Sequence, residues 1–292
     1  MPSAPDAAID SRAAEWWVIE ARQNGLLDRA RELWRYRYLW WYFAADTITS
    51  TFRRSQLGWL WLLARVTAPV GLNAAVFGGV LGVDSGRTPY FLFFLCGTTT
   101  WVLFERSLLF VTRSLESNRK LITKVYFPRL ILPMSAIAPG LLYLGILLIV
   151  TVATVIYYFR RDGVWYITFR PELLASVAAI ALSLAFTVAV GLWTSVLQAR
   201  YRDIRYGLRY LMPFWMYFTP IIYPATMIPE QWRWLVAINP MAPIVELFKW
   251  GTLGQAHLTT ANVITSLVLI TITMISGMWF FNREEAASVD KL

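Results

Sequence analysis

Six long apolar runs separated by charged loops constrain this chain more than any other feature of its sequence. A bilayer core accommodates about 20 apolar residues of α-helix, and each run has roughly that length. Only 15% of the residues are charged, whereas soluble domains carry about 25%. The sequence therefore predicts an all-α polytopic membrane protein with six transmembrane helices. The runs are residues 57–82, 90–112, 130–158, 173–197, 207–224 and 262–281.

Lysine and arginine are unequally distributed between the loops on the two sides of these runs. Most of them lie in residues 1–56, 113–129 and 198–209. The positive-inside rule therefore places both termini in the cytoplasm. The net charge of +9 follows from this topology and does not indicate nucleic-acid binding, because the cations are spread over one membrane face. We expect residues 1–25, which lack the apolar core of a signal peptide, and residues 286–292 to be polar cytoplasmic tails.

Residues 26–52, before the first run, predict an amphipathic helix at the membrane interface. Apolar residues recur there at three- and four-residue steps, and arginines lie on another face. Aromatic residues with flanking arginines suit the lipid headgroup layer. The alternative is a helix packed on another protein domain, and the two can coexist. The apolar residues are Leu27, Ala30, Trp34, Tyr38, Trp41, Ala45, Ile48 and Phe52.

Two charged loops on the cytoplasmic side carry helix signals. Residues 113–129 contain no glycine and no proline before Pro128, which predicts a short helix. Its apolar edge requires a partner that covers it; a solvated connector is the alternative. In the loop 198–209, Asp203 can pair with a neighbouring arginine or cap the next helix. The apolar edge consists of Leu115, Leu121, Ile122 and Val125.

Charges within the runs need partners, because an isolated ion is costly in hydrocarbon. Arg65 lies in the first run and Glu105 in the second. At about 1.5 Å per residue, both lie about 12 Å from the inner boundary. We therefore expect an Arg65–Glu105 ion pair, either within the chain or with Glu105 of a second copy.

The segment that follows the fifth run is apolar and aromatic, but prolines interrupt it. Pieces at about 230–238 and 241–252 are too short to span a bilayer, so they dip into the membrane or lie on it. Non-helical backbone at that depth persists only when it is buried in protein or lines a cavity. The sequence thus predicts re-entrant outer helices and an outer gate within residues 225–252. The aromatic residues of this gate are Trp232, Trp234, Phe248 and Trp250.

Four short motifs follow one another along residues 35–285. They are Phe52-Arg-Arg-Ser-Gln-Leu-Gly-Trp-Leu-Trp61, Leu121-Ile-Thr-Lys-Val-Tyr-Phe-Pro-Arg129 with Leu132-Pro133, Tyr201-Arg-Asp-Ile-Arg205 with Met216-Tyr-Phe-Thr-Pro-Ile-Ile-Tyr-Pro224, and Asn239-Pro-Met-Ala-Pro-Ile-Val-Glu246. In this order, and within six runs, they resemble the membrane subunit, or permease, of ABC exporters of polysaccharides. That family includes the O-antigen, capsule and teichoic acid exporters.

The resemblance implies a permease domain over residues 53–285 that forms a homodimer with two separate ATP-binding subunits, which hold ATP and Mg. The chain itself has no G-x-x-x-x-G-K-[ST] loop, and we expect no cofactor, metal or catalytic residue in it. In the family, the loop between spans two and three is a coupling helix docked on the ATPase, which residues 114–127 match. The loop 200–206 gives a second contact. The coupling residues are then Arg119, Lys120, Leu121, Lys124, Tyr126, Arg202 and Asp203.

The resemblance also implies a substrate, a polyprenyl-diphosphate-linked glycan that crosses the bacterial inner membrane. Arg53 and Arg54 lie at the inner doorway, and an arginine fork binds phosphate well; anchoring the helix is the alternative. Glycans slide past aromatic faces, so aromatic side chains can line the channel. For these residues, interfacial belts next to membrane lipids and packing within the bundle are the alternatives. The candidates are Trp59, Trp61, Tyr210, Phe214, Tyr217 and Phe218.

Two other functions compete with this one. An ABC permease could instead export a drug or a small lipid. A membrane-embedded glycosyl- or acyltransferase needs carboxylates or histidines placed together, but His257 is the only histidine and has no acidic cluster beside it. The single cysteine, Cys96, excludes a disulfide within the chain and is expected to be an inert lipid-facing or core residue.

Overall fold

The computed structural model describes residues 31–289 apart from 32, 53–57, 126, 168–169 and 256–258. All regular secondary structure in these residues is helical, as the sequence predicts. Five segments within them are long and apolar enough to cross a bilayer, which fits a multi-pass membrane protein. These segments are Leu60–Val80, Tyr90–Ser117, Ile131–Asp162, Leu173–Arg200 and Thr260–Glu284.

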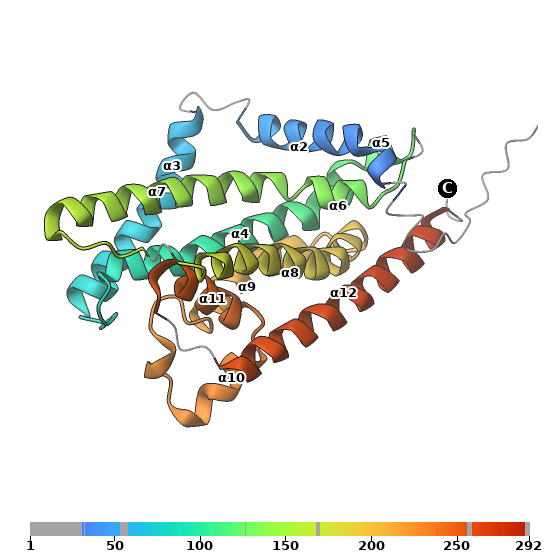
Figure 1. The fold of residues 1–292 in the computed structure, drawn as a ribbon. Helices are drawn as coiled ribbons and strands as arrows, with labels where there is room; N and C mark the ends of the chain where they lie inside the picture. The colour runs from blue at the N-terminus through green and yellow to red at the C-terminus, as the bar shows by residue number, and fades with distance from the viewer. Residues whose placement is uncertain are drawn as a thin grey trace, which may run out of the picture.

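The helices are connected by short turns and loops (Figure 1). Gly163 and Gly254 end α7 and α11 with φ of 71° and 67°, a left-handed conformation that glycine adopts without a Cβ clash. The long helices are α3 (Gly58–Ala74) with the π-helical turn η1 (Ala75–Val80), α4 (Tyr90–Ser117), α7 (Ala138–Asp162), α8 (Leu173–Arg200) and α12 (Thr260–Val289). The shorter ones are α2 (Arg37–Phe52), α5 (Arg119–Ile122), α6 (Ile131–Ser135), α9 (Ile204–Tyr217), η2 (Ala225–Met227), η3 (Glu230–Trp232), α10 (Arg233–Ile238) and α11 (Met241–Leu253).

Helix α4 is the central element of the bundle. In the most apolar 18 residues of its span, 78% are buried, compared with 22% in the span that contains α3 and 17% in the span that contains α12. It packs against α7, α8 and α11, and small residues permit the close approach. A Cβ on Gly140 of α7 would collide with Ser107, and one on Gly191 of α8 would collide with Val111. Small residues at such contacts are typical of helix packing in membranes.

Helix α2 packs on α6 and α7 at one end of the bundle, called here the α5 end (Figure 1). Phe43 is buried there, with its ring 5.7 Å from that of Phe127. By contrast, the predicted interfacial residues Trp34, Tyr38 and Trp41 are exposed. Apolar side chains therefore occupy two faces of the helix. One face packs against the bundle, and the other is exposed. Residues 26–30 of the predicted interface helix lie outside the described part of the chain.

The fifth apolar run, residues 207–224, does not form one long helix. Helix α9 begins at the α5 end and ends at Tyr217, after which the backbone continues through Pro220 to Pro224 as turns and extended chain. The ring of Trp215 in α9 lies 5.3 Å from that of Phe104 in α4. The helical hairpin of α10 and α11 follows, and α11 packs against α8 and α4 at the opposite end, called here the α11 end.

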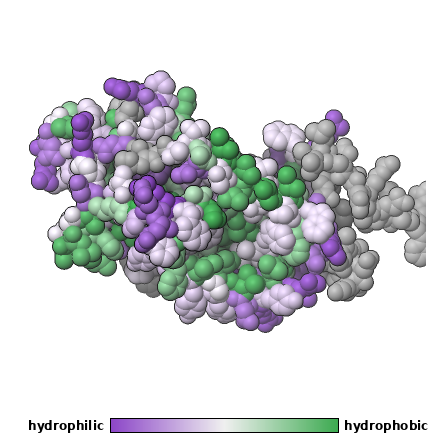
Figure 2. All heavy atoms as spheres, turned by 90° about the horizontal axis from the view of Figure 1, so that it is seen from below, coloured by the Kyte–Doolittle hydropathy of each residue, from purple (hydrophilic) through white to green (hydrophobic). Residues whose placement is uncertain are grey.

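The remaining surface of the long helices is largely apolar. Broad hydrophobic areas lie on the face of the chain that Figure 2 shows. Aliphatic residues of α7 and α12 recur on one side of each helix, as expected where a helix faces hydrocarbon. These exposed residues include Leu148, Ile149 and Val152 in α7, and Ile264, Val268, Ile272 and Ile275 in α12.

Candidate functional site

The predicted coupling segment, residues 114–127, is the end of α4 followed by the single turn α5. Asn118 separates the two helices with φ of −104° and ψ of 15°, and its Nδ2 donates to Ser114 O at 2.8 Å. The apolar edge of the segment is not left for a partner to cover. Leu121 and Ile122 are half-buried in a cluster built around Phe43 and Phe127, so α2 of the same chain covers much of this edge.

The charged residues of this segment remain on the surface. Arg119, Lys120 and Lys124 are exposed, as is Val125. None of the three cations forms an ion pair among the described residues. Tyr126 lies outside the described part of the chain. The segment therefore offers a basic surface with one apolar side chain, supported from behind by α2.

The loop between α8 and α9 lies beside the end of α4. Arg202 and Asp203 are exposed. Asp203 precedes α9 but forms no capping hydrogen bond through its side chain and no ion pair, so neither role predicted for it is seen in the described residues. The buried Gln198 holds this loop instead: its Oε1 accepts a hydrogen bond from Arg205 N at 2.7 Å. Sequence reasoning missed Gln198, whose only signal is an uncharged polar residue at the end of an apolar run.

Four predicted channel residues form a continuous stripe on α9 and its extension. They are separated by steps of one, three and four residues, which places them on one side of the helix. All four are exposed, whereas Met212 and Trp215 on the other side pack into the bundle. Packing among the described residues therefore does not account for these four side chains. This aromatic stripe consists of Tyr210, Phe214, Tyr217 and Phe218.

The other inner-doorway residues are only partly described. Trp61 on α3 is exposed, like the aromatic stripe. The side chain of Trp59 lies outside the described part of the structure, as do Arg53 and Arg54.

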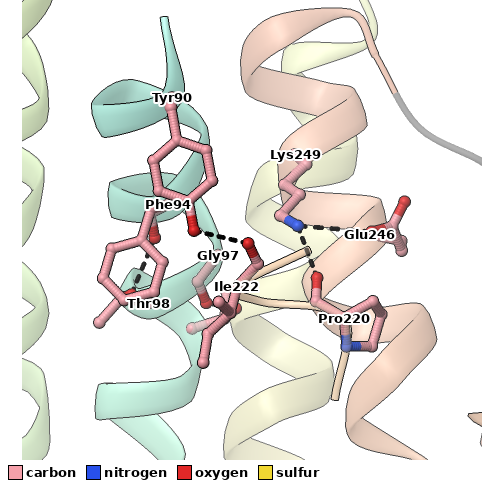
Figure 3. Close-up of polar contacts among 9 residues, drawn as sticks. Tyr90, Phe94, Gly97, Thr98, Pro220, Ile222, Glu246 and Lys249 are labelled. Carbon is pink, nitrogen blue, oxygen red and sulfur yellow. Dashed lines mark hydrogen bonds and ion pairs between the residues drawn. The ribbon is translucent and has the colours of Figure 1, made fainter. Parts of the chain in front are cut away.

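Side chains from α4, from α11 and from the turn between α10 and α11 satisfy alternate carbonyl groups of the broken segment after α9. Asn239 Nδ2 donates to Phe218 O at 3.3 Å, and Lys249 Nζ donates to Pro220 O at 2.6 Å. Tyr90 Oη donates to Ile222 O at 2.6 Å (Figure 3). Backbone without helical hydrogen bonds persists in an apolar interior only when its polar groups find such partners. The sequence predicted the break but not the side chains that hold it.

Lys249 is the central member of this group. It is 1% exposed, its Nζ lies 3.5 Å from Glu246 Oε1, and it lies 3.7 Å from the centre of the Phe93 ring. Gly97 of α4 leaves room for it, because a Cβ there would lie 2.9 Å from Lys249 Cε. A buried cation is tolerated when a carboxylate, a carbonyl and a ring surround it. A lysine three residues after a glutamate within an apolar segment was the only sequence signal for this pair.

Comparison with known proteins decides the family. A sequence model of the ABC-2 type transporter family matches residues 38–253. The chain belongs to the ABC-2 type transporter family. Membership makes it a multi-pass membrane subunit for transport and implies an ABC ATPase partner.

Two relatives align with this ABC-2 type chain over most of their length. It is similar to the O-antigen export system permease protein RfbA of Myxococcus xanthus, with 24% identity over 266 residues, or 88% of this chain and 97% of the relative. A Klebsiella pneumoniae protein of the same name is 26% identical over 238 residues, or 80% of this chain and 86% of that protein.

Three of the four outer-gate residues of this ABC-2 type chain lie on its surface. Trp232, Trp234 and Trp250 are exposed. Phe248 differs from the other three, because its side chain is 2% exposed and packs in the main hydrophobic core. Because α11 packs against both α4 and α8, it turns this residue inward.

The predicted Arg65–Glu105 ion pair does not form within the chain. Arg65 is exposed on α3, whereas Glu105 is partly buried on α4. The neighbouring Arg106 has its guanidinium 5.3 Å from the centre of the Tyr143 ring. Only the alternative with Glu105 of a second copy stays a prediction. Cys96 is fully buried in α4, as expected for a core residue.

Proposed function

We propose that this chain is the transmembrane subunit of an ATP-driven exporter that moves a lipid-linked, O-antigen-like polysaccharide across the bacterial inner membrane. The similarity, over 80–88% of this chain, to two proteins named O-antigen export system permease supports the substrate class. The observation that carries the proposal is the aromatic stripe of α9, which is turned away from the rest of its own chain. Sugar rings rest on such faces without strong hydrogen bonds that would hold them in place.

The proposal includes a six-span topology with cytoplasmic termini, in which α9 and its extension make the fifth crossing. Gln198 bonds both Glu116 and Arg205 at one end, and Tyr90 bonds Ile222 at the other. Between these points α4 extends over about 39 Å at 1.5 Å per residue. The 14 residues of α9 give about 21 Å, so the helix alone does not cover this length. The turns of residues 218–222 complete the path to Ile222, which supports a crossing completed by non-helical backbone.

The α10–α11 hairpin fits the proposed re-entrant element. The start of α11 is held by Ser266 of α12, whose Oγ donates to Pro240 O at 2.9 Å. The other end lies beside the first turns of α8, where Ser176 Oγ and Thr252 Oγ1 are 3.0 Å apart. The hairpin thus lies in the α11 half of the bundle, which is the outer half in the proposed topology. In the proposal residues 225–252 form the outer gate, with Trp232, Trp234 and Trp250 at its surface.

The remaining parts of the proposal concern partners. Two copies of the chain enclose the channel between their aromatic stripes, and each copy docks an ATP-binding subunit, which holds ATP and Mg. The exposed cations of the 119–124 segment, together with Arg202 and Asp203, form the docking surface. Arg53 and Arg54 hold the diphosphate at the inner doorway. ATP binding moves the docking surface, α9 shifts with it, and repeated cycles move the glycan outward.

Reconstitution tests this function directly. The chain is purified with its ATPase subunit, placed in proteoliposomes and supplied with polyprenyl-diphosphate-linked glycan. We expect ATP-dependent movement of glycan to the opposite side, measured by its accessibility to a glycosidase. A variant of the ATPase subunit that binds but does not hydrolyse ATP serves as the control. A complex that hydrolyses ATP but moves only drugs or short lipids would contradict the proposal.

A further inference from the structure

Gln198 lies where the ends of α4 and α8 meet the beginning of α9. It is 1% exposed. Its Nε2 donates to Glu116 Oε2 at 2.7 Å, and its Oε1 accepts from Arg205 N at 2.7 Å. A weaker contact of 3.4 Å joins Nε2 to Arg202 O. One amide group therefore joins three helices that are separated in sequence.

Both strong hydrogen bonds of this amide have a clear physical role. The first N–H groups of a helix have no partner within the helix, and the side chain of Asp203 does not bond them. Gln198 supplies the missing acceptor from a different helix, to Arg205 N in the first turn of α9. Its other contact is to a carboxylate, and hydrogen bonds to charged acceptors are among the stronger ones. Both the oxygen and the nitrogen of the Gln198 amide are thus held in place.

A second contact between α4 and α8 lies one helical turn away. Thr112 Oγ1 and Thr194 Oγ1 are 2.8 Å apart and buried. This threonine pair joins the same two helices, and its hydrogen bonds involve only residues of α4 and α8. The threonine pair is therefore a matched control for Gln198. Both contacts hold α4 to α8, but of the two only Gln198 also holds α9.

We propose that Gln198 is the positioning residue that transmits movement of the α5 segment to the aromatic stripe of α9. Glu116 lies three residues before Arg119, the first residue of α5, so displacement of the docking surface acts first on this carboxylate. Gln198 passes the displacement to Arg205, five residues before Tyr210, where the stripe begins. The inference rests on the proposed function, because it requires an ATPase that moves α5.

Export and ATP hydrolysis, measured in the same proteoliposomes, separate coupling from folding. The variants are Gln198→Ala and, as the matched control, Thr194→Val in the complete complex with the ATPase. For Gln198→Ala we expect hydrolysis within about twofold of wild type and export reduced about tenfold, the size of a typical lost coupling. Thr194→Val is expected to retain both activities, since the α9 link is intact.

Spin labels give a readout that a merely structural role would not change. Because Cys96 is the only cysteine and is buried, cysteines introduced at exposed sites can be labelled selectively. Labels at the exposed Thr123 report movement of the α5 segment, and labels at Arg209 report movement of α9, each measured between the two copies. In the Gln198→Ala complex we expect the ATP-dependent distance change at Thr123 to remain and the change at Arg209 to disappear.

Several outcomes would overturn the inference. It fails if Gln198→Ala exports as well as wild type, if Thr194→Val loses export equally, or if the Arg209 distance still responds to ATP in the Gln198→Ala complex. If Gln198→Ala does not assemble, Gln198→Glu replaces it. This variant keeps an acceptor for Arg205 N but repels Glu116, and the same distances decide. A wild-type complex that hydrolyses ATP without exporting glycan would instead contradict the proposed function itself.

Discussion

Replacing Lys249 by methionine tests whether the buried pair in α11 holds the broken fifth crossing in place. The substitution retains much of the side-chain volume but removes the charge. It leaves Pro220 O without the donor at 2.6 Å and Glu246 without the cation at 3.5 Å. Removing one partner of a buried ion pair costs about 3–5 kcal/mol. We expect a loss of that size in the free energy of unfolding.

The double variant Glu246→Leu/Lys249→Met sharpens this prediction. It removes both charges, so the remaining cost is chiefly the unsatisfied Pro220 carbonyl, about 1–3 kcal/mol. The double variant should therefore be more stable than Lys249→Met by about 2 kcal/mol, the difference between those two ranges. The reason is that a buried carboxylate that has lost the Lys249 cation destabilises the fold more than an apolar side chain does.

Unfolding in mixed micelles by titration with a denaturing detergent measures these differences. Arg233→Met is the control, because the Arg233–Glu230 pair at 3.2 Å is exposed and exposed pairs contribute little. Its unfolding midpoint should equal that of wild type. The reasoning is refuted if Lys249→Met is as stable as wild type, or if the double variant is no more stable than the single one.

Three further predictions each concern one residue. Tyr90→Phe leaves Ile222 O without its donor and should lower stability by about 1–3 kcal/mol, whereas Tyr157→Phe at an exposed site should not; detergent unfolding measures both. Gly191→Ala, whose Cβ meets Val111, should destabilise by about 1–3 kcal/mol through overpacking. The control Gly145→Ala has free space for its Cβ, so equal losses of stability at both glycines would contradict the packing described. Phe214→Ala removes an exposed ring, so the unfolding midpoint should stay unchanged while reconstituted export falls. Unchanged export would show that Phe214 does not line the channel.

The apolar runs predicted the long helices well. Runs 130–158, 173–197 and 262–281 correspond to α6–α7, α8 and α12, because uninterrupted apolar sequence of that length favours a membrane helix. The fifth run was harder to predict. Pro213 is accommodated within α9, but the helix ends before Pro220, and the three side chains that support the break come from distant positions. Periodicity within one segment carries no information about such contacts.

Some side chains of the site were also predictable from the sequence, whereas others were not. The four residues of the aromatic stripe were predicted together as channel candidates, and the structure places them on one exposed face of α9, because residues three and four apart share a face. Lys249 lies within the predicted outer gate, residues 225–252, where no role was predicted for it, and it is buried beside Glu246. The apolar edge at Leu121 was assigned to a partner protein, but α2 covers much of it. In both cases a tertiary contact satisfies a group that the local sequence leaves without a partner.

Photo-crosslinking from the aromatic stripe tests the central claim, that α9 lines the path of the glycan. A photoreactive phenylalanine analogue replaces Phe214 in the complete complex, and the matched control replaces Val268, which is exposed on the apolar side of α12. During ATP-driven export of radiolabelled lipid-linked glycan, we expect crosslinks to the sugar from position 214 and none from position 268. Export that proceeds without crosslinks from position 214, or with equal crosslinking from both positions, would contradict the account.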